Sequence, residues 1–264
     1  MSAAGARLAT LAIAAALAAS GCSGPDLDVP DTSLDVVEVL PRPTGFTQGL
    51  ELLDDGTLLH STGGRGRSAI TLLRLDGSVV ARSPLPGGHY GEGVTQVGRT
   101  VYQLTWQDGV VYTWSVPDLE PGPTYALAGE GWGLCHDDTR GHLWLSDGSN
   151  RLRALALPDL RLLGVTAVTL GDGTPLASLN ELECVDGHVW ANVWMTDTVV
   201  EIDPASGAVL ARHDLQELRE VVRPRGQQDV LNGIAHDDRD DTWLVTGKNW
   251  DRIFRVRLSA AAGR

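Results

Sequence analysis

The chain contains a single lysine, Lys248, in the stretch VTGKNWD, although lysine and arginine together number 21. This lone lysine could be an accident of an arginine-rich composition. Alternatively, its position requires a compact positive charge whose pKa burial can tune, which lysine provides and arginine does not. Carboxylates, amides and indoles recur at intervals along the rest of the chain. They are Gln48, Glu92, Trp106, Trp132, Asn180, Glu181, Trp194 and Asn232. Gathered in one concavity with an ammonium, such groups would form a binding site for a small molecule or a peptide.

The intervals arise because the sequence repeats. Five similar openings follow one another, namely FTQGLE, YGEGVT, GWGLCH, NELECV and NGIAHD. A period of about 40 to 50 residues is typical of propeller blades. The openings align when Gln48, Glu92, Trp132, Glu181 and Asn232 are taken as equivalent. Each opening then leads through a polar turn into a second apolar run that alternates as strands do, and three of the five continue into a third run and a turn. The sequence therefore predicts an all-β fold, a five-bladed β-propeller of four-stranded antiparallel blades.

Two further patterns refine this prediction. The segment DLQELREVVRPRG places apolar residues at helical spacing before Pro224, which predicts one short helix inserted between the fourth and fifth blades. The alignment also gives one equivalent place in the second strand to Leu58, Tyr102, Trp144, Trp190 and Trp243. We expect the three tryptophans of this set to pack between blades.

The propeller geometry predicts where the polar residues meet. In an up-and-down blade, the start of the first strand and the end of the second strand lie at the same rim, so both face one mouth of the channel. We expect Lys248 and the eight carboxylate, amide and indole residues that recur along the chain to gather there, together with Phe46, Asp147, Asn192 and Trp250. Taken singly, each has an ordinary explanation, because tryptophans on strands are usually core, acids near turns are usually solvated and amides often close turns. Their convergence from every blade is what indicates a site.

Seven short motifs, FTQGLE, YGEGVT, LTW, GWGL, LNELE, ANVW and TGKNW, resemble in this order those of the plant-type glutaminyl-peptide cyclotransferases, which also occur in bacteria. The resemblance runs from Phe46 to Arg257. It implies a five-bladed propeller enzyme, an acyltransferase that converts the amino-terminal glutamine of peptides or proteins into pyroglutamate and releases ammonia. It also implies that no metal or other cofactor is needed, and no His or Cys pair here has zinc-ligand spacing.

The resemblance identifies Glu92 as the general base and acid. The amides of Gln48 and Asn180 can hold the substrate carboxamide or ammonium, and Lys248 can oppose the developing negative charge. An apolar clamp would be formed by Phe46, Trp106, Trp132 and Trp194. Glu181 and Asn232 share the ring and could serve as supports.

Two other classes of function stay open. A calcium-dependent, lactonase-like propeller hydrolase could use Glu92, Asp147, Asn180 and Asn232 as ligands. A non-catalytic surface propeller could capture a ligand in the same mouth. A metal requirement would favour the first class, and binding of glutaminyl peptides without ammonia release would favour the second.

The charge balance excludes some partners. The formal net charge is −13 and no cluster of basic residues stands out, which disfavours a nucleic-acid surface or an anionic-lipid surface. We expect a monomer whose only contact with a membrane is a lipid anchor.

The amino terminus predicts export. Arg7 precedes the apolar run LATLAIAAALAAS, which is too short to span a bilayer comfortably, and small residues then lead to Cys22. AASGC resembles the lipobox of bacterial lipoproteins, in which the cysteine becomes the lipidated first residue. An ordinary signal peptide and a secreted soluble protein are the alternative. We therefore expect a signal peptide over 1–21, a flexible tether over 22–35 and a catalytic propeller over 36–264 of a cell-envelope lipoprotein.

The two remaining cysteines, Cys135 and Cys184, stand three residues after Trp132 and Glu181. The alignment places them at equivalent positions on the first strands of neighbouring blades. We expect them to be adjacent, either as a disulfide formed in an oxidising compartment or as two buried thiols.

Overall fold

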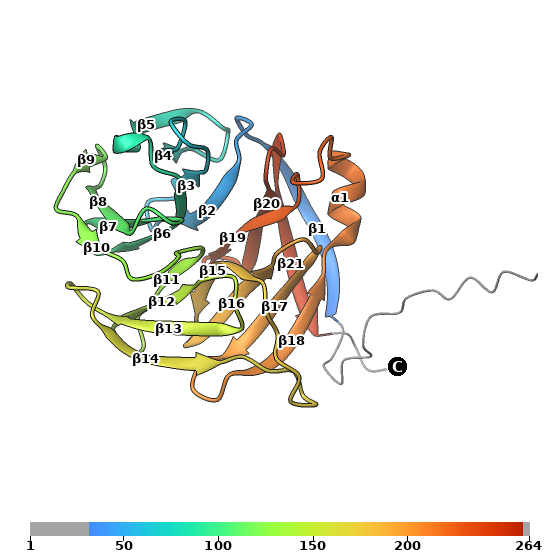
Figure 1. Ribbon diagram of the computed structural model, residues 1–264. Coiled ribbons are helices and arrows are strands. Elements are labelled where there is room, and N and C mark those ends of the chain that lie inside the picture. Colours follow the sequence, from blue (N-terminus) through green and yellow to red (C-terminus); the bar gives the residue numbers. More distant parts are fainter. Residues whose placement is uncertain (1–31, 261–264) are drawn as a thin grey trace, which may run out of the picture.

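The computed structural model describes residues 32–260, and most of them lie in five antiparallel sheets around one axis (Figure 1). Each sheet is one blade, so the predicted five-bladed β-propeller is confirmed. The first strands of neighbouring blades contact one another and line the axis.

The strands follow the chain from blade to blade. Blade 1 contains β2 (Thr47–Leu52), β3 (Leu58–Thr62), β4 (Ala69–Leu73) and β5 (Val79–Pro84). A 3-10 turn (Pro86–Gly88) leads to blade 2, with β6 (Gly91–Val97), β7 (Thr100–Thr105), β8 (Val110–Ser115) and the short β9 (Glu120–Pro121) and β10 (Tyr125–Ala126). Blade 3 contains β11 (Leu134–Asp137), β12 (His142–Ser146), β13 (Arg151–Ala156) and β14 (Leu162–Ala167). Blade 4 contains β15 (Leu179–Val185), β16 (His188–Val193), β17 (Thr198–Asp203) and β18 (Ala208–Asp214). Blade 5 contains β19 (Leu231–Asp237), β20 (Thr242–Gly247), β21 (Arg252–Ala260) and, as its outer strand, β1 (Thr32–Pro41).

The core lies between the blades. Strand β4 is buried along its whole length because a neighbouring blade covers each face of its sheet, which explains its continuous apolar run AITLL. The outer strands β5 and β14 leave large apolar side chains such as Val79 and Leu162 half exposed. Packing between blades therefore stabilises the inner strands most.

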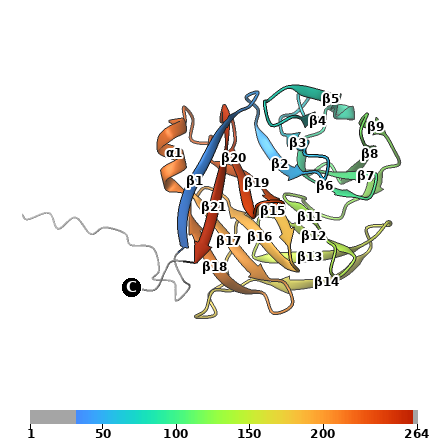
Figure 2. The same cartoon turned by 180° about the vertical axis from the view of Figure 1, so that it is seen from behind.

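The two ends of the described chain close the ring. Strand β1 pairs with β21 from Thr32 opposite Ala260 to Pro41 opposite Arg252, and the two strands lie side by side in Figure 2. Residues 32–35, which were expected to belong to the tether, therefore lie in a blade strand, ahead of the expected start of the propeller near Val36. The signal peptide, Cys22 and the rest of the tether lie outside the described residues.

The predicted helix is present as α1 (Gln216–Val222), between β18 and β19. It buries Leu218, which packs with Leu215 and with Leu231 of blade 5. Arg223 adopts a left-handed conformation and Pro224 follows it, so the helix ends there. Within residues 32–260, no helix is both long and apolar enough to cross a membrane.

A bulge at the start of the first strand sets the position of the polar residues. Pairing with the second strand shifts at Gln48, Glu92, Asn180 and Asn232. Bulges re-aim side chains, and three of these four, Gln48, Glu92 and Asn180, line one cavity at this end of the axis. Asn180 rather than Glu181 is therefore the counterpart of Glu92 in blade 4, and the alignment on Glu181 was wrong by one residue.

The second strands contain a related correction. Tyr102, Trp144 and Trp190 pair with first-strand residues of their own blades. Each of these partners stands three residues after the equivalent first-strand position of its blade, which is Glu92 in blade 2, Trp132 in blade 3 and Asn180 in blade 4. In blades 1 and 5, the residues that stand three positions after Gln48 and Asn232 pair with Leu59 and Leu244. The predicted equivalence of Leu58 and Trp243 was therefore wrong by one residue. A shift of one residue turns a side chain to the other face of its sheet.

The tryptophans nevertheless pack between blades, as predicted. Trp144 of blade 3 joins a core cluster with Val189 and Val200 of blade 4. Trp190 and Trp243 approach each other from blades 4 and 5, with ring centroids 4.2 Å apart. Trp243 can meet Trp190 because its side chain faces the opposite way within its own blade.

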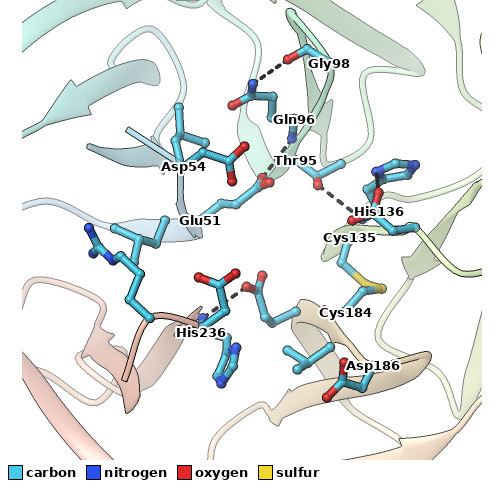
Figure 3. A pocket seen from close by; sticks show the side chains of 17 residues that line it. Glu51, Asp54, Thr95, Gln96, Gly98, Cys135, His136, Cys184, Asp186 and His236 are labelled. Atoms are coloured by element: carbon cyan, nitrogen blue, oxygen red, sulfur yellow. Dashed lines mark hydrogen bonds and ion pairs between the residues drawn. A yellow bond between two sulfur atoms is a disulfide. The ribbon is translucent and has the colours of Figure 1, made fainter. Parts of the chain in front are cut away.

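Cys135 of β11 and Cys184 of β15 form a disulfide between blades 3 and 4, with Cα atoms 5.4 Å apart. The predicted adjacency is confirmed, but the two positions are not equivalent, because Cys135 corresponds to Glu183. The disulfide borders a cavity at the channel mouth where the first strands end, and Glu51 and Asp186 line the same cavity (Figure 3).

Candidate active site

A cavity of about 210 Å³ opens at the other mouth, where the first strands begin and the second strands end. Its lining residues are Phe46, Gln48, Tyr90, Glu92, Trp106, Trp132, Asn180, Trp194, Gln228 and Lys248. All the residues predicted to act in catalysis or in the aromatic clamp are among them. Glu181 and Asn232 are not.

Glu92 lies on the floor of the cavity and is 4% exposed. Its Oε1 accepts a hydrogen bond of 2.8 Å from the Nε2 of Gln48. A Cβ atom at the neighbouring Gly93 would come within 2.7 Å of the Trp132 carbonyl oxygen and the Leu134 nitrogen. Glycine is therefore required beside Glu92, because the first strands of blades 2 and 3 approach closely there.

Lys248 follows β20 and is also 4% exposed. Its Nζ lies 5.0 Å from the centroid of the Phe46 ring, which is a cation–π distance. Its backbone N–H donates to the carbonyl of Val230, at 2.9 Å, so the residue is fixed at the rim. The lone ammonium of the chain is thus held inside the cavity.

The two buried charges influence each other. Burial raises the pKa of Glu92 well above its ordinary value, although the charge of Lys248 and the hydrogen bond from Gln48 oppose this. Burial lowers the pKa of Lys248 to about 8, and here the charge of Glu92 opposes the change. Both shifts bring the groups toward the pH range in which a carboxyl group and an amine can exchange protons with a substrate.

Aromatic rings form the walls. Trp132 and Trp194 meet edge to face at 5.4 Å, and Tyr90 and Trp106 meet at 5.7 Å. Burial raises the pKa of Tyr90 to about 12, with a further contribution from the charge of Glu92. The rings leave the polar groups on the floor with little access to water.

One carboxylate outside the cavity fixes two of these indoles. Glu130 Oε2 accepts hydrogen bonds from Trp106 Nε1, at 2.8 Å, and from Trp132 Nε1, at 3.0 Å. Its other oxygen accepts from Gln107 at 2.7 Å. Hydrogen bonds from Gln107 and from the indoles lower the pKa of Glu130, which favours the charged form that orients both rings.

Asn180 offers a free acceptor. The residue is 2% exposed, and its Oδ1 has no hydrogen-bond partner among the described residues. An unpaired buried oxygen is costly, so this atom is suited to receive an N–H from a bound molecule. The amide oxygen of Asn180 and the carboxylate of Glu92 therefore offer acceptors from two different blades.

Glu181 and Asn232 lie behind the cavity. Buried Glu181 accepts hydrogen bonds from the backbone N–H groups of Leu50, at 3.1 Å, and Ile234, at 2.9 Å, which ties blade 4 to blades 1 and 5. Asn232 donates to the Thr47 carbonyl, at 3.0 Å, and lies 3.5 Å from the Gln48 amide oxygen. Both residues support the first strands, and Asn232 also orients Gln48.

Three other residues expected at this rim also point elsewhere. The Asp147 carboxylate accepts a hydrogen bond of 3.1 Å from the backbone of Ser149. Asn192 accepts from the Gly233 N–H at 2.9 Å, and Trp250 donates to the Asp229 carbonyl at 3.1 Å.

The four residues considered as calcium ligands are not gathered, because Glu92 and Asn180 line the cavity whereas Asp147 and Asn232 do not. Among residues 32–260, no group of three or more His, Cys, Asp and Glu side chains is arranged to hold a metal ion.

Sequence reasoning missed Tyr90, Gln228 and Glu130. Tyr90 precedes Glu92 by two residues, as Phe46 precedes Gln48, so the repeat contained a signal for it. Glu130 stands at the same offset before Trp132, but its role depends on two indoles brought together by the fold. Gln228 lies in the connection after α1, which has no counterpart in the other blades, so no repeat could indicate it.

Comparison with known proteins agrees with this arrangement. The model of the glutamine cyclotransferase family matches residues 7–258. The glutaminyl-peptide cyclotransferase of Arabidopsis thaliana is 32% identical over 249 residues, which are 92% of this chain and 77% of that protein. The crystal structure of Myxococcus xanthus glutaminyl cyclase matches with a TM-score of 0.82 and 34% identity, over 89% of this chain and 100% of the other. The chain therefore belongs to the glutamine cyclotransferase family.

Proposed function

We propose that this protein is a glutaminyl-peptide cyclotransferase that converts the amino-terminal glutamine of peptides or proteins into pyroglutamate and releases ammonia. The observation that carries the proposal is the buried Glu92, hydrogen-bonded to Gln48, in an aromatic-walled cavity that also contains Lys248. Membership of the glutamine cyclotransferase family supports the same activity.

The reaction is an internal aminolysis. The α-amine of the glutamine attacks the carbon of its own γ-carboxamide, a C–N bond forms, and the carbonyl oxygen becomes an oxyanion. The bond to the amide nitrogen then breaks, and this nitrogen leaves as ammonia after gaining a proton. Because nucleophile and carbonyl belong to one molecule, the protein has to fold the substrate, move one proton and stabilise one charge.

Glu92 is placed to move the proton. As a carboxylate it accepts a proton from the attacking amine, and as an acid it returns that proton to the departing nitrogen. Burial raises its pKa toward the range of a proton shuttle, and Gln48 fixes the orientation of the carboxyl group. Asn180 Oδ1, which has no partner among the described residues, can accept an N–H of the carboxamide and so hold the leaving group beside Glu92.

Lys248 supplies the positive charge that the oxyanion requires. Its compact ammonium lies inside the cavity, over the Phe46 ring. The indoles of Trp106, Trp132 and Trp194 enclose the folded-back glutamine side chain and exclude water, which would otherwise compete as a nucleophile. Each step is thus assigned to a side chain, and we expect turnover to be unaffected by a chelator.

The test is ammonia release from Gln-Ala-NH2 by the purified protein, with and without chelator, compared with the Glu92→Gln variant. We expect release by the unaltered protein in both conditions and a large loss in the variant. Loss of activity with chelator would favour a metal-dependent enzyme, and tight binding of the peptide without ammonia release would favour a binding protein.

We further propose that the protein is exported, is anchored to the cell envelope through lipidated Cys22, and acts as a monomer. The support is the AASGC sequence and a ring of blades that closes within one chain. Labelling with a radioactive fatty acid, lost in Cys22→Ser, tests the anchor, and light scattering tests the oligomeric state.

A further inference from the structure

A second cavity adjoins the candidate active site and has a different chemical character. It has a volume of about 650 Å³, within the range of ligand-binding clefts, and it opens over blade 1 beside the loop that joins β1 to β2. Phe46 and Tyr90 line both cavities. The two spaces are therefore neighbours that share these two rings.

Arginine dominates the charge of this groove. Arg65, Arg67 and Arg82 are all exposed and all line it, and none of the aspartates or glutamates of residues 32–260 does. This contrasts with a chain whose net charge is −13. The three residues come from the connection after β3 and from β5, so the cluster forms only when the blade folds.

Two of the guanidinium groups are available. Arg65 is paired with Asp108 at 2.8 Å, and the other oxygen of Asp108 accepts the Tyr90 N–H at 2.9 Å, which ties this wall to the active-site strand. Within residues 32–260, Arg67 and Arg82 make no hydrogen bond or ion pair through their guanidinium groups. The positive charge of Arg67 nevertheless acts on the Tyr90 hydroxyl and lowers its pKa, which opposes the larger effect of burial.

The geometry next to Tyr90 connects the groove to the chemistry. A Cβ atom at Gly63 would come within 2.4 Å of the Tyr90 ring, so the loop that bears Arg65 and Arg67 packs directly against this ring. The smaller cavity is about 210 Å³, which leaves room for little more than the amino-terminal glutamine of a substrate. The residues that follow the glutamine in a peptide substrate must therefore extend out of the smaller cavity. Phe46 and Tyr90 line both cavities, so a chain that passes these two rings enters the groove.

We propose that this groove, defined by Phe46, Tyr90, Arg65, Arg67, Arg82 and Asn249, is the subsite for the residues that follow the amino-terminal glutamine and selects peptides with acidic side chains there. The inference rests on the proposed function. An acidic side chain within the first three residues after glutamine would meet the unpaired guanidinium groups of Arg67 and Arg82, whereas a basic one would be repelled.

The experiment compares kcat/KM for ammonia release from Gln-Ala-Ala-Ala-NH2 and from versions with glutamate or lysine at the second, third or fourth position. Each value is divided by that for Gln-Ala-NH2, which has little or no chain to place in the groove. At low salt we expect the best glutamate peptide to exceed the alanine peptide by about threefold to fivefold, the size expected for exposed ion pairs, and the matching lysine peptide to fall below it. The preference should shrink at high salt.

The double variant R67Q/R82Q should bring glutamate and lysine peptides to within about twofold of each other. Arg74→Gln is the matched control, because Arg74 is an exposed arginine of blade 1 that does not line the groove, and it should keep the preference. Equal rates for glutamate and lysine peptides in the unaltered protein, or a preference that survives in R67Q/R82Q, would overturn the subsite alone. Failure to turn over any peptide, including Gln-Ala-NH2, would overturn the proposed function and the subsite with it.

Discussion

Replacing Lys248 by arginine should damage catalysis although the charge is kept. Lys248 is 4% exposed, and its ammonium lies 5.0 Å from the Phe46 ring centroid, inside a cavity of about 210 Å³. A guanidinium group is planar, wider and less compact, so it would occupy part of the space needed by the γ-carboxamide and would displace the positive charge from the oxyanion. We expect kcat/KM to fall by at least about tenfold, or about 1.4 kcal/mol of transition-state stabilisation.

The pH profile provides a second readout of the same substitution. Burial lowers the pKa of Lys248 to about 8, so its ammonium is present below that pH and is lost above it. The substrate amine, with an ordinary pKa of about 8, must instead lose its proton to attack. The two requirements predict a bell-shaped profile with a maximum near pH 8. In Lys248→Arg the alkaline limb should disappear, because arginine stays protonated throughout this range.

The assay is ammonia release from Gln-Ala-NH2 across the pH range, with circular dichroism to show that the variant folds. Arg74→Lys is the control for the reverse exchange, since it alters an exposed cation outside the cavity and should leave the profile unchanged. A folded Lys248→Arg protein with unaltered kcat/KM and an intact alkaline limb would remove Lys248 from the mechanism.

Three further changes have distinct outcomes. Glu92→Gln keeps the shape but cannot carry a proton, so steady-state turnover should fall by about 100-fold or more, and near-normal turnover in a folded variant would contradict the assigned role. Glu130→Gln removes the anion that orients two indoles, so KM for Gln-Ala-NH2 should rise by severalfold, and unchanged kinetics would show that packing alone holds the rings. The double variant C135A/C184A loses a cross-link that spans 49 residues, and urea denaturation should show a free energy of unfolding lower by about 4 kcal/mol; equal stability would mean that the bond is absent in solution.

The repeats predicted the blade count because each blade needs the same buried first and second strands, and these leave a periodic apolar pattern. The register within a blade was harder to predict. Asn180 and Glu181 are adjacent polar residues, and either could have been the counterpart of Glu92. The bulge that turns Asn180 toward the cavity is set by pairing between strands, which residue types alone do not reveal.

The same limit explains why Glu130 and the arginine-lined groove were missed. Glu130 matters because two indoles from different strands donate to one of its oxygens, and no local pattern records that meeting. The arginine groove likewise joins Arg65 and Arg67 of one loop with Arg82 of an outer strand, so no basic cluster stands out along the sequence. Residues that repeat with the blades could be predicted, whereas residues placed by a single tertiary contact could not.

The most direct test of the central claim is product analysis with a free and a blocked amino terminus. Purified protein is incubated with Gln-Ala-NH2 or with its N-acetylated form, and ammonia and pyroglutamyl product are quantified together. Because the α-amine is the nucleophile, we expect equimolar ammonia and pyroglutamyl-alanine amide from the free peptide and neither from the acetylated one. Ammonia release from the acetylated peptide, or glutamate in place of pyroglutamate, would show that water attacks the carboxamide and would contradict the account.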